Sequence, residues 1–478
     1  MTGWFPRITL HSLVVLSSVL IYVLTTRVER ERRPPAVAIA WVLGMIALPY
    51  LALPMYLLFG RRKLPRRKIR WSGVRTAPHH WAEELIESFG LPGAAPASTQ
   101  MHQDGRESAA ALFMMIAAAK SRLDLCTYIL GDDAFGRDTM QRLMTRARHG
   151  IQVRVMIDGV GALQLPRASF KQMEAAGIET AIFSPLFARR TQGPRNLRNH
   201  RKMLIADGTH LWSGGRNIAA EYFSGGEGVT AWRDLTFDLR GGPAQAAAAQ
   251  FEADWVDAGG KPASGNVLEM AAADMVAPLL KANQTPTAMP APSVAAHDPA
   301  RGRAQFLPSG PDQTEDTVHA LLIDACFQAR DRMLAVTPYF VPDSSLETAM
   351  RLAARRGVQI DLCIPQVSNH RLADFARNRS LRALSQAGVN VHLMPGMNHA
   401  KAVVFDESMA FTGSVNLDSR SLLLNYECAT VFYDPVQINW LAGWIQSLIP
   451  ESVTFDAHPP TLLRDLAEGL LLTVAYQL

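Results

Sequence analysis

Hydrophobic residues gather first in two long runs near the start of the chain. Residues 8–26 form 19 consecutive positions without a formal charge, and residues 36–59 form 24. Each run reaches the roughly 20 residues that a membrane-spanning helix needs. The pattern therefore predicts an N-terminal hairpin of two transmembrane helices. A cleaved signal peptide is the alternative for the first run, but no small-residue cleavage site follows it, and a second run comes next.

Beyond residue 100 the pattern changes to short β-branched runs that alternate with helical periodicity, and this arrangement occurs twice. The helix and strand around Gly150 match those around Gly357, and the segment around Gly177 matches that around Gly388. Each copy is expected to run strand, helix, strand, helix, strand, which is typical of an α/β sandwich with a mixed sheet. Residues 285–299, rich in Pro and Ala, predict a linker between the copies.

The length of 478 residues suggests about three units. The patterns agree with this number and add a linker, which gives four parts. We expect a membrane hairpin with a basic segment, a first repeat, a linker, and a second repeat with a C-terminal segment. The corresponding boundaries are 1–70, 71–284, 285–304 and 305–478.

Charge sharpens the interpretation of the N-terminal part. The formal net charge is +5, yet residues 1–70 carry +10 and the rest of the chain −5. More Lys and Arg lie on the outer flanks of the two runs than in the loop between them. This difference predicts that both hairpin ends and the body lie on the cytoplasmic side. The basic cluster at 61–70 is either this topology signal alone or also a site for anionic lipid head groups.

Composition excludes other classes of protein and site. Hydrophobic residues make up 48% and charged residues 19%, which excludes a disordered chain and a coiled coil. The four cysteines form no C-x-x-C pair, so we expect buried thiols and neither a disulfide framework nor a zinc site.

The residues that carry chemistry form one motif that both copies contain. The pattern H-x-K-x4-D-x6-G-[GS]-x-N begins at His200 and again 199 residues later at His399. Two matches at the same place in each repeat indicate a functional site. The candidate catalytic residues are His200, Lys202, Asp207, His399, Lys401 and Asp406.

Spacing within the motif assigns a direction to each side chain. The apolar segment after each histidine predicts a strand, on which side chains alternate between faces. His200 and Lys202 then share one face, whereas Asp207 has the opposite parity and should point away or cap the strand end. The glycine-rich turn brings the backbone close to a ligand, so Asn217 and Asn416 are candidate phosphate-binding residues.

Neither copy is complete alone, since each supplies one imidazole, one ammonium group and one amide. Docked together, the copies would place two histidines on either side of one phosphorus atom and two lysines near its oxygens. This arrangement requires no metal ion and no cofactor.

At these residues the chain resembles the phospholipase D superfamily, over about residues 100–445, and within it the bacterial cardiolipin synthases. Further similar segments are YLLFGRRK (56–63), FLPSGPD (306–312), TPYFVPD (337–343), NLDSRSLLLNYE (416–427) and the GGRNI turn (214–218). The apolar C-terminal segment, DLAEGLLLTVAYQL, resembles that family only loosely.

The resemblance implies a mechanism with a phosphohistidine intermediate, in which one motif histidine attacks the phosphodiester and the other protonates the leaving alcohol. By analogy His200 is the nucleophile and His399 the acid and base, although the symmetry of the motif leaves the choice open. A carboxylate 28–34 residues after each histidine is implied to orient its imidazole, and Asp234 and Glu427 occupy these positions.

The implied reaction joins two phosphatidylglycerols into cardiolipin and releases glycerol, at the inner membrane of a bacterium, with the chain embedded as a multi-pass protein. Phosphatidylglycerol and cardiolipin in the bilayer would then be its partners. Residues 187–199 are a candidate lid or a plain surface loop.

Four rival functions remain. They are a phospholipase D hydrolase, a transphosphatidylase that uses phosphatidylethanolamine, a phosphodiesterase or nuclease, and an inactive membrane scaffold. The acidic body argues against nucleic acid as a partner, and the two intact motifs argue against an inactive scaffold.

Overall fold

The computed structural model describes residues 10–29, 35–60, 63, 80–186, 196–225, 230–262, 302–464 and 467–468. Several predicted features therefore lie outside the described residues. They are most of the linker at 285–304, the basic segment at 61–70 apart from Lys63, residues 187–195 of the candidate lid at 187–199, and most of the C-terminal segment.

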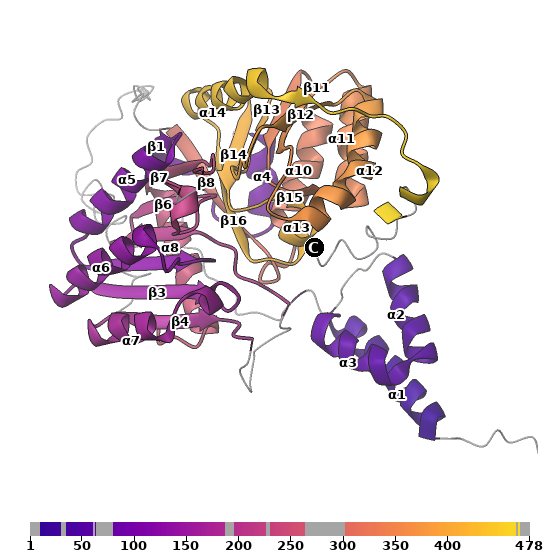
Figure 1. The fold of residues 1–478 in the computed structure, drawn as a ribbon, viewed down its shortest axis with the longest axis horizontal. Helices are drawn as coiled ribbons and strands as arrows, with labels where there is room; N and C mark the ends of the chain where they lie inside the picture. The colour runs from indigo at the N-terminus through magenta and orange to yellow at the C-terminus, as the bar shows by residue number, and fades with distance from the viewer. Residues whose placement is uncertain are drawn as a thin grey trace, which may run out of the picture.

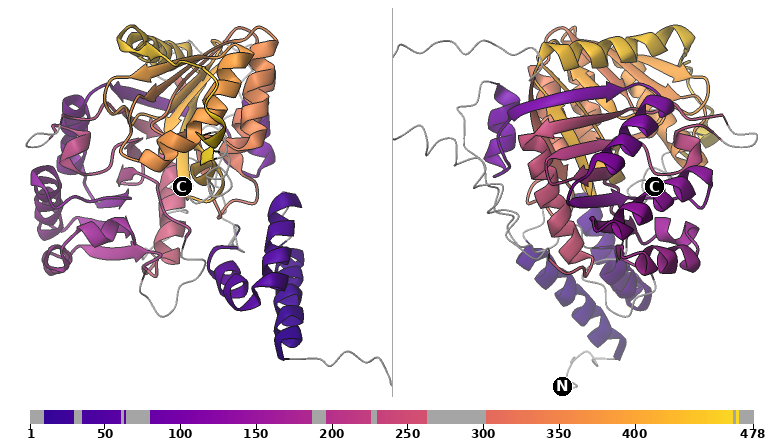
Figure 2. Two further views of the ribbon diagram at one scale, coloured as in Figure 1. Left: turned by 45° about the vertical axis from the view of Figure 1, so that its right-hand side comes forward. Right: turned by 90° about the vertical axis from the view of Figure 1, so that its left-hand side faces the viewer.

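The N-terminal part folds into three helices that stand beside the body of the protein (Figures 1 and 2). They are α1 (Leu10–Glu29), α2 (Pro35–Ala47) and α3 (Pro49–Phe59). Tyr22, Met45 and Tyr56 are buried where the three helices meet.

The structure does not contain the expected pair of membrane-spanning helices among its described residues. Within the part of the chain that the structure describes, no helix is both long enough and apolar enough to cross a membrane. The predicted span at 36–59 is interrupted at Leu48, whose φ of −138° and ψ of 59° are not helical. The next residue is Pro49, and a proline ring disfavours the helical conformation of the residue before it.

Each repeat contains the predicted order of strand, helix, strand, helix, strand. In the first repeat this unit is β2 (Arg122–Thr127), α6 (Ala134–Arg148), β3 (Gln152–Asp158), α7 (Arg167–Ala175) and β4 (Glu179–Phe183). In the second repeat it is β9 (Arg332–Val336), α11 (Ser344–Arg355), β11 (Gln359–Pro365), α12 (Arg371–Ala387) and β12 (Asn390–Met394). The predicted duplication is confirmed.

Further elements complete the first half of the body. They are α4 (Trp81–Ser88), β1 (Ala95–His102), α5 (Gly105–Ala118), η1 (Gly161–Gln164), β5 (Met203–Ala206), β6 (His210–Gly214), η2 (Ala220–Tyr222), β7 (Thr236–Gly241) and α8 (Gly242–Asp257). Those of the second half are β8 (Gly302–Ser309), α10 (Thr317–Gln328), β10 (Phe340–Val341), β13 (Ala402–Phe405), β14 (Met409–Gly413), β15 (Leu417–Asp418), α13 (Ser419–Leu423), β16 (Glu427–Phe432), α14 (Pro435–Leu448), η3 (Ile449–Glu451) and β17 (Val453–Thr454).

Glycines end the four helices that the repeat pattern located. Gly150, Gly177, Gly357 and Gly388 have φ angles of 85°, 91°, 97° and 106°. A side chain would meet no atom within 4 Å at any of them, so backbone conformation rather than space requires glycine. The helix that each glycine ends is thereby turned back toward the next strand.

The two repeats share one continuous mixed sheet instead of two separate ones. Its 15 described strands follow the order β17-β12-β11-β9-β13-β14-β16-β8-β1-β7-β6-β5-β2-β3-β4. The first strands of the two repeats, β1 and β8, pair antiparallel at its centre. Each would otherwise be an exposed strand edge, and pairing satisfies its backbone groups. The strand order on one side of this pair mirrors the order on the other.

Helices cover both faces of the sheet. α8 and α14 pack over the largest hydrophobic cluster, which contains residues of both repeats, such as Phe237 and Phe432 with ring centroids 5.6 Å apart. α5 to α7 cover the other face of the first repeat, and α10 to α12 that of the second. The four cysteines are free and buried, as expected.

Candidate active site

The histidine and lysine of each motif lie just before a strand rather than within one. His200 and Lys202 precede β5, and His399 and Lys401 precede β13. All four residues are buried or nearly so. The apolar segments after the histidines thus form the predicted strands, and each histidine and lysine lies just outside its strand.

The backbone around each motif histidine pairs with the other repeat. The amide of His200 donates to the carbonyl oxygen of Tyr426 at 2.8 Å, and the amide of Tyr426 donates to Arg198 at 2.9 Å. In the same way the amide of His399 donates to the carbonyl oxygen of Arg233 at 2.6 Å. Each histidine is therefore held next to the residue that precedes a carboxylate of the opposite repeat.

The orienting carboxylates are consequently exchanged between the repeats. Nδ1 of His200 donates to Oε1 of Glu427 at 2.9 Å, and Nδ1 of His399 donates to Oδ2 of Asp234 at 2.8 Å. The expectation that each carboxylate orients the histidine of its own copy is wrong. Sequence distance suggested that pairing, whereas backbone pairing between the copies decides the actual one.

The different glycine-rich turns fit the different carboxylates. A Cβ atom on Gly215 would lie 2.2 Å from Oδ1 of Asp234, so only glycine leaves room for that carboxylate. The equivalent residue of the second copy, Ser414, instead donates its hydroxyl to Oε2 of Glu427. The GG and GS forms of the motif thus each support one carboxylate.

The two lysines reach back toward their own histidines. Nζ of Lys202 donates to the carbonyl oxygen of His200 at 2.8 Å, and Nζ of Lys401 donates to that of His399. Burial lowers the pKa of Lys202 to about 8 and that of Lys401 to about 7, although Asp234 and Glu427 favour the charged forms. Their ammonium groups thus titrate close to neutral pH.

Burial disfavours the charged form of both imidazoles. Burial lowers the pKa of His200, and burial with the adjacent Lys401 lowers the pKa of His399 to about 3. Lys401 also lowers the pKa of His200, and Lys202 that of His399, so the two motifs form one electrostatic site.

The carboxylates remain ionised beside these groups. Burial alone would raise their pKa values, but the neighbouring histidine and lysine side chains lower the pKa of both Asp234 and Glu427. Each can therefore accept a hydrogen bond from Nδ1–H and leave Nε2 of its histidine as the basic nitrogen.

The two histidines differ in access. The side chain of His200 is 13% exposed and that of His399 is 4%. Nζ of Lys401 lies 3.1 Å from Nε2 of His399. Among the described residues, no hydrogen-bond partner lies at Nε2 of His200. His200 thus has the more available basic nitrogen.

Aromatic rings that sequence reasoning missed surround the histidines. The ring of Tyr128 lies 5.1 Å from that of His200, and Tyr222 and Trp232 lie 5.1 and 5.6 Å from His399. The sequence offered a signal for Tyr128, because a tyrosine also follows the matched strand of the second copy, one position later, in TPYFVPD.

The predicted phosphate-binding asparagines are buried beside the motif and bound to neighbouring loops. Oδ1 of Asn217 accepts from the amide of Ile129 at 3.3 Å, and Nδ2 of Asn416 donates to the hydroxyl of Ser421 at 3.0 Å. Oδ1 of Asn416 is buried and has no partner in the described part of the chain. Phosphate binding by these residues stays a prediction.

The motif aspartates lie at the other ends of β5 and β13 from the histidines. Asp207, with φ of 53°, accepts backbone amides from Lys120 to Arg122, and Asp406, with φ of 50°, accepts those from Arg330 to Arg332. Asp207 thus binds the segment that leads into β2, and Asp406 the segment that leads into β9, the strands that pair with β5 and β13. A catalytic role for either aspartate stays a prediction.

A buried arginine beside the first histidine was also missed. Arg201 is fully buried, and its guanidinium contacts Asp254 at 2.6 Å and Asp312 at 2.7 Å. Its Nε donates to the carbonyl oxygen of Glu427 at 2.9 Å. Arg201 therefore ties the first motif to the second repeat. The FLPSGPD segment contains Asp312, but nothing in the sequence indicates its partner.

Comparisons with known proteins agree with this architecture. A family model described as "Cardiolipin synthase, PLD-like domain" matches residues 112–255 and 322–449, and one described as phospholipase D-nuclease N-terminal matches residues 14–61. Cardiolipin synthase A of Pseudomonas aeruginosa is 28% identical over 456 residues, covering 90% of this chain and 88% of its own. The major cardiolipin synthase of Bacillus subtilis is also 28% identical, over 89% of both chains.

A solved structure supports the fold. The crystal structure of phosphatidylserine synthase from Haemophilus influenzae aligns with a TM-score of 0.59 and 14% identity, covering 84% of this chain and all of the other. The two segments matched by the first family model span more than half of the chain and contain His200 and His399 respectively. The chain therefore belongs to the cardiolipin synthase family of phospholipase D-like enzymes.

Proposed function

We propose that the chain transfers a phosphatidyl group from one phosphatidylglycerol to another, giving cardiolipin and glycerol, through a phosphohistidine intermediate. The observation that carries this proposal is the pair of imidazoles, each oriented by a carboxylate of the opposite repeat and accompanied by a buried lysine. Two nearly equivalent half-sites suit a reaction in which donor and acceptor are the same lipid.

In the first step Nε2 of His200 attacks the phosphorus of the donor lipid. The bond from phosphorus to the head-group glycerol oxygen breaks, and His399 supplies the proton that this oxygen takes up. Lys202 and Lys401 stabilise the charge on the phosphoryl oxygens. A bound phosphodiester also offsets the positive charge of Lys401, which raises the pKa of His399, so that His399 takes up a proton when substrate binds and then acts as the acid.

In the second step a hydroxyl of the acceptor phosphatidylglycerol enters where glycerol has left. His399, now neutral, takes the hydroxyl proton, and the oxygen attacks phosphorus while the bond to His200 breaks. The aromatic rings of Tyr128, Tyr222 and Trp232 border the histidines and limit access of water, which would give phosphatidic acid instead.

The reaction is tested with the purified protein and phosphatidylglycerol labelled in its head-group glycerol and phosphate. Equal amounts of cardiolipin and free glycerol are expected. Phosphatidic acid as the sole lipid product would make the chain a hydrolase, and cardiolipin formed only with phosphatidylethanolamine present would change the donor.

Single variants test the two histidines. His200→Ala and His399→Ala should each lower turnover by at least about a thousandfold, because each removes a nucleophile or a general acid. His149→Ala, which alters an exposed histidine at the end of α6, is the matched control and should keep full activity. Substantial turnover by either motif variant would contradict the two-histidine mechanism.

We also propose that α1 to α3 attach the enzyme to the bilayer that holds its substrate. The supporting observation is the number of large apolar side chains that these helices expose. They are Leu10, Leu13, Leu16, Leu20, Val23, Leu24, Val37, Ile39, Leu43, Ile46, Leu48, Tyr50, Leu51, Met55, Leu57 and Leu58. A surface of this kind is typical of a segment that contacts lipid or another apolar partner.

Vesicle flotation tests this attachment. The double variant Leu16→Asp and Leu20→Asp should recover less protein with phosphatidylglycerol vesicles than the native chain does. Met114→Asp, which places the same charge on an exposed apolar residue of the body, is the control. Equal flotation of all three proteins would rule out attachment through these helices.

A further inference from the structure

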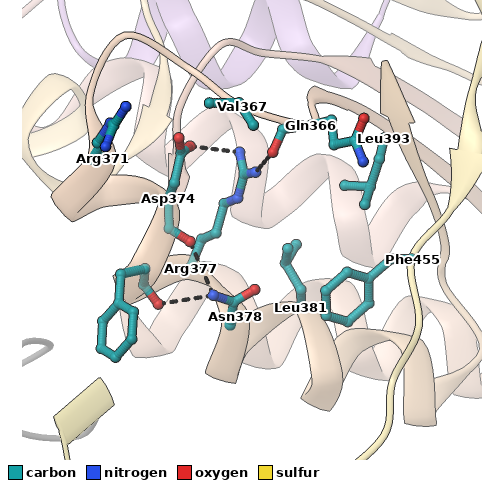
Figure 3. A pocket seen from close by; sticks show the side chains of 10 residues that line it. Gln366, Val367, Arg371, Asp374, Arg377, Asn378, Leu381, Leu393 and Phe455 are labelled. Atoms are coloured by element: carbon teal, nitrogen blue, oxygen red, sulfur yellow. Dashed lines mark hydrogen bonds and ion pairs between the residues drawn. The ribbon is translucent and has the colours of Figure 1, made fainter. Parts of the chain in front are cut away.

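A cavity of about 360 Å³ lies in the second repeat, apart from the two motif histidines. It is bordered by the first three turns of α12, the residues directly after β11, β12 and the segment after β17 (Figure 3). Leu381, Leu393 and Phe455 form an apolar wall on one side (Figure 3). The other wall carries arginines, so the cavity combines an apolar surface with positive charge.

The central polar group of the cavity is the guanidinium of Arg377, which is 5% exposed. Nη2 donates to the carbonyl oxygen of Gln366 at 2.8 Å, and Nη1 forms an ion pair with Asp374 at 2.9 Å (Figure 3). Nε is buried, and no acceptor among the described residues reaches it. A buried donor without an acceptor costs free energy, which a bound anion would recover.

The balance of charge in the cavity also favours an anion. Asp374 offsets the positive charge of Arg377. Arg371 adds a second positive charge at the exposed rim, and no other acidic residue lines the cavity to offset it. The side-chain amide of Asn378 lies on the same wall. Arginine side chains bind phosphate oxygens through charge-assisted hydrogen bonds.

We propose that this cavity is a second binding site for a phosphate group, which the head group of an anionic phospholipid carries into it. Its volume suits a head group rather than two acyl chains, since pockets for small ligands begin at about 300 Å³. The apolar wall would contact the first carbons of the lipid. The choice of lipid rests on the proposed function, whereas the phosphate chemistry rests on the cavity.

The cavity borders a loop that reaches the active site. Gln366 and Val367 line the cavity, and two residues further on Asn369 accepts a hydrogen bond from the hydroxyl of Tyr339. The ring of Tyr339 lies 6.4 Å from that of His399. A head group bound at Arg377 would therefore hold the loop that supports the ring beside His399.

Calorimetric titration tests the site on the full chain with His200→Ala and His399→Ala, in which no transfer occurs. Short-chain dihexanoyl phosphatidylglycerol should bind with two equivalents per chain, one at the motif lysines and one in the cavity. Arg377→Gln on this background should remove one equivalent. Two equivalents that persist in Arg377→Gln would overturn the proposal.

A second variant avoids any loss of internal contacts. Val367 is 64% exposed, and Val367→Asp places a negative charge at the cavity wall that should weaken the second equivalent at least tenfold. Val436→Asp makes the same change at a 60% exposed position on α14 and should leave the affinity of the second equivalent unaltered. Equal binding by these two variants would count against the cavity.

Further ligands identify the source of the phosphate. Inorganic phosphate should compete for the cavity equivalent only at higher concentration than the lipid, and dihexanoyl phosphatidylcholine, which has no net charge, should not compete. Tighter binding of inorganic phosphate than of the lipid would overturn the head-group assignment, as would equal binding of phosphatidylcholine. These outcomes concern binding alone, so a failure of the proposed transfer reaction would be seen separately.

Discussion

Asp234 and Glu427 show how a single side chain in one repeat sets the chemistry of a histidine in the other. Each accepts a hydrogen bond from Nδ1–H of the histidine and so favours the tautomer that leaves Nε2 basic. The carboxylates are fully buried and close to the motif lysines, which keeps them ionised. In the proposed mechanism, catalysis by either histidine therefore depends on both copies.

Asp234→Asn should lower turnover by about a thousandfold or more, since the amide no longer selects the reactive tautomer. The ring nitrogen signals of His399 should change in an NMR spectrum, and those of His200 should stay as they are. Glu427→Gln should give the reverse pattern. A change confined to His200 in Asp234→Asn would contradict the exchanged pairing.

Gly215 and Ser414 occupy equivalent positions but should respond differently to substitution. Gly215→Ala places a Cβ atom 2.2 Å from Asp234 and must displace that carboxylate. Turnover should fall at least tenfold. Ser414→Gly removes one hydrogen bond to Glu427 without a clash, so its loss should be smaller. Initial rates of cardiolipin formation compare the two, and a larger loss in Ser414→Gly would contradict this ranking.

The pKa values of the two motif lysines predict how kcat/KM changes at alkaline pH. With pKa values of about 8 for Lys202 and about 7 for Lys401, both are charged below this range and lose their charge as the pH rises through it. Attraction for the anionic substrate weakens, so kcat/KM should fall between about pH 7 and 9. Circular dichroism over the same range serves as the control for unfolding. A flat profile would show that the lysine charges do not contribute.

At the scale of elements, the sequence predicted what local patterns determine. Period and glycine position located the repeated strand and helix units, and the glycines at 150, 177, 357 and 388 end their helices as the pattern indicates. The span at 36–59 was predicted wrongly, because hydropathy was weighed above the effect of Pro49 on Leu48. Continuity of the sheet through β1 and β8 has no local signal at all.

The TPYFVPD segment illustrates a local pattern whose role the structure explains. Asp343 caps α11 by accepting the amides of Ser345 and Leu346, and it binds Nε2 of His319 at 2.7 Å. Burial opposes ionisation, but the contact with His319 and the capping hydrogen bonds hold the pKa of Asp343 at about 2. The charged form therefore stabilises the fold.

Asp343→Ala should lower the free energy of unfolding by about 1–2 kcal/mol, the usual cost of losing a helix cap. Urea titration at pH 7 measures this loss, and Asp343→Asn, which can still cap, should lose less. Because the folded pKa is depressed, the contribution of the charge is complete above the unfolded pKa near 4 and disappears as the pH falls through about 2. Equal stability of Asp343→Ala and the native chain would refute the capping role.

At the scale of the whole molecule, contacts between distant segments assemble the site. These contacts could not be predicted from the sequence. The motif residues themselves were found from their spacing. Pairing between segments up to 227 residues apart brings Asp234 to His399 and Glu427 to His200. The same pairing provides the contact of Arg201 with Glu427. No period or composition records such a pairing.

Lys63 connects the N-terminal helices to this assembly. Its Nζ donates to the carbonyl oxygens of Gly310 and Gln313 at 3.1 and 3.0 Å and pairs with Asp316 at 2.8 Å. The same loop contains Asp312, which holds Arg201 beside the first motif. Attachment of the helices and order of the active site are therefore linked through one loop.

Lys63→Met should loosen this loop, because the methionine keeps the length of the side chain and loses its charge and donors. Hydrogen exchange at residues 310–316 should be faster than in the native chain, and turnover should fall about two- to fivefold. Lys171→Met, on α7 of the first repeat, is the matched control. Unchanged exchange at 310–316 would show that Lys63 does not hold the loop.

The exchanged carboxylates also constrain how this gene can change. After a duplication, two copies normally drift apart because each can accumulate substitutions independently. Here a substitution at Asp234 acts on His399, and one at Glu427 acts on His200, so the compensating change must arise in the other copy. The two halves must therefore evolve as one unit, and a half exchanged with a relative would bring a carboxylate selected for a different histidine.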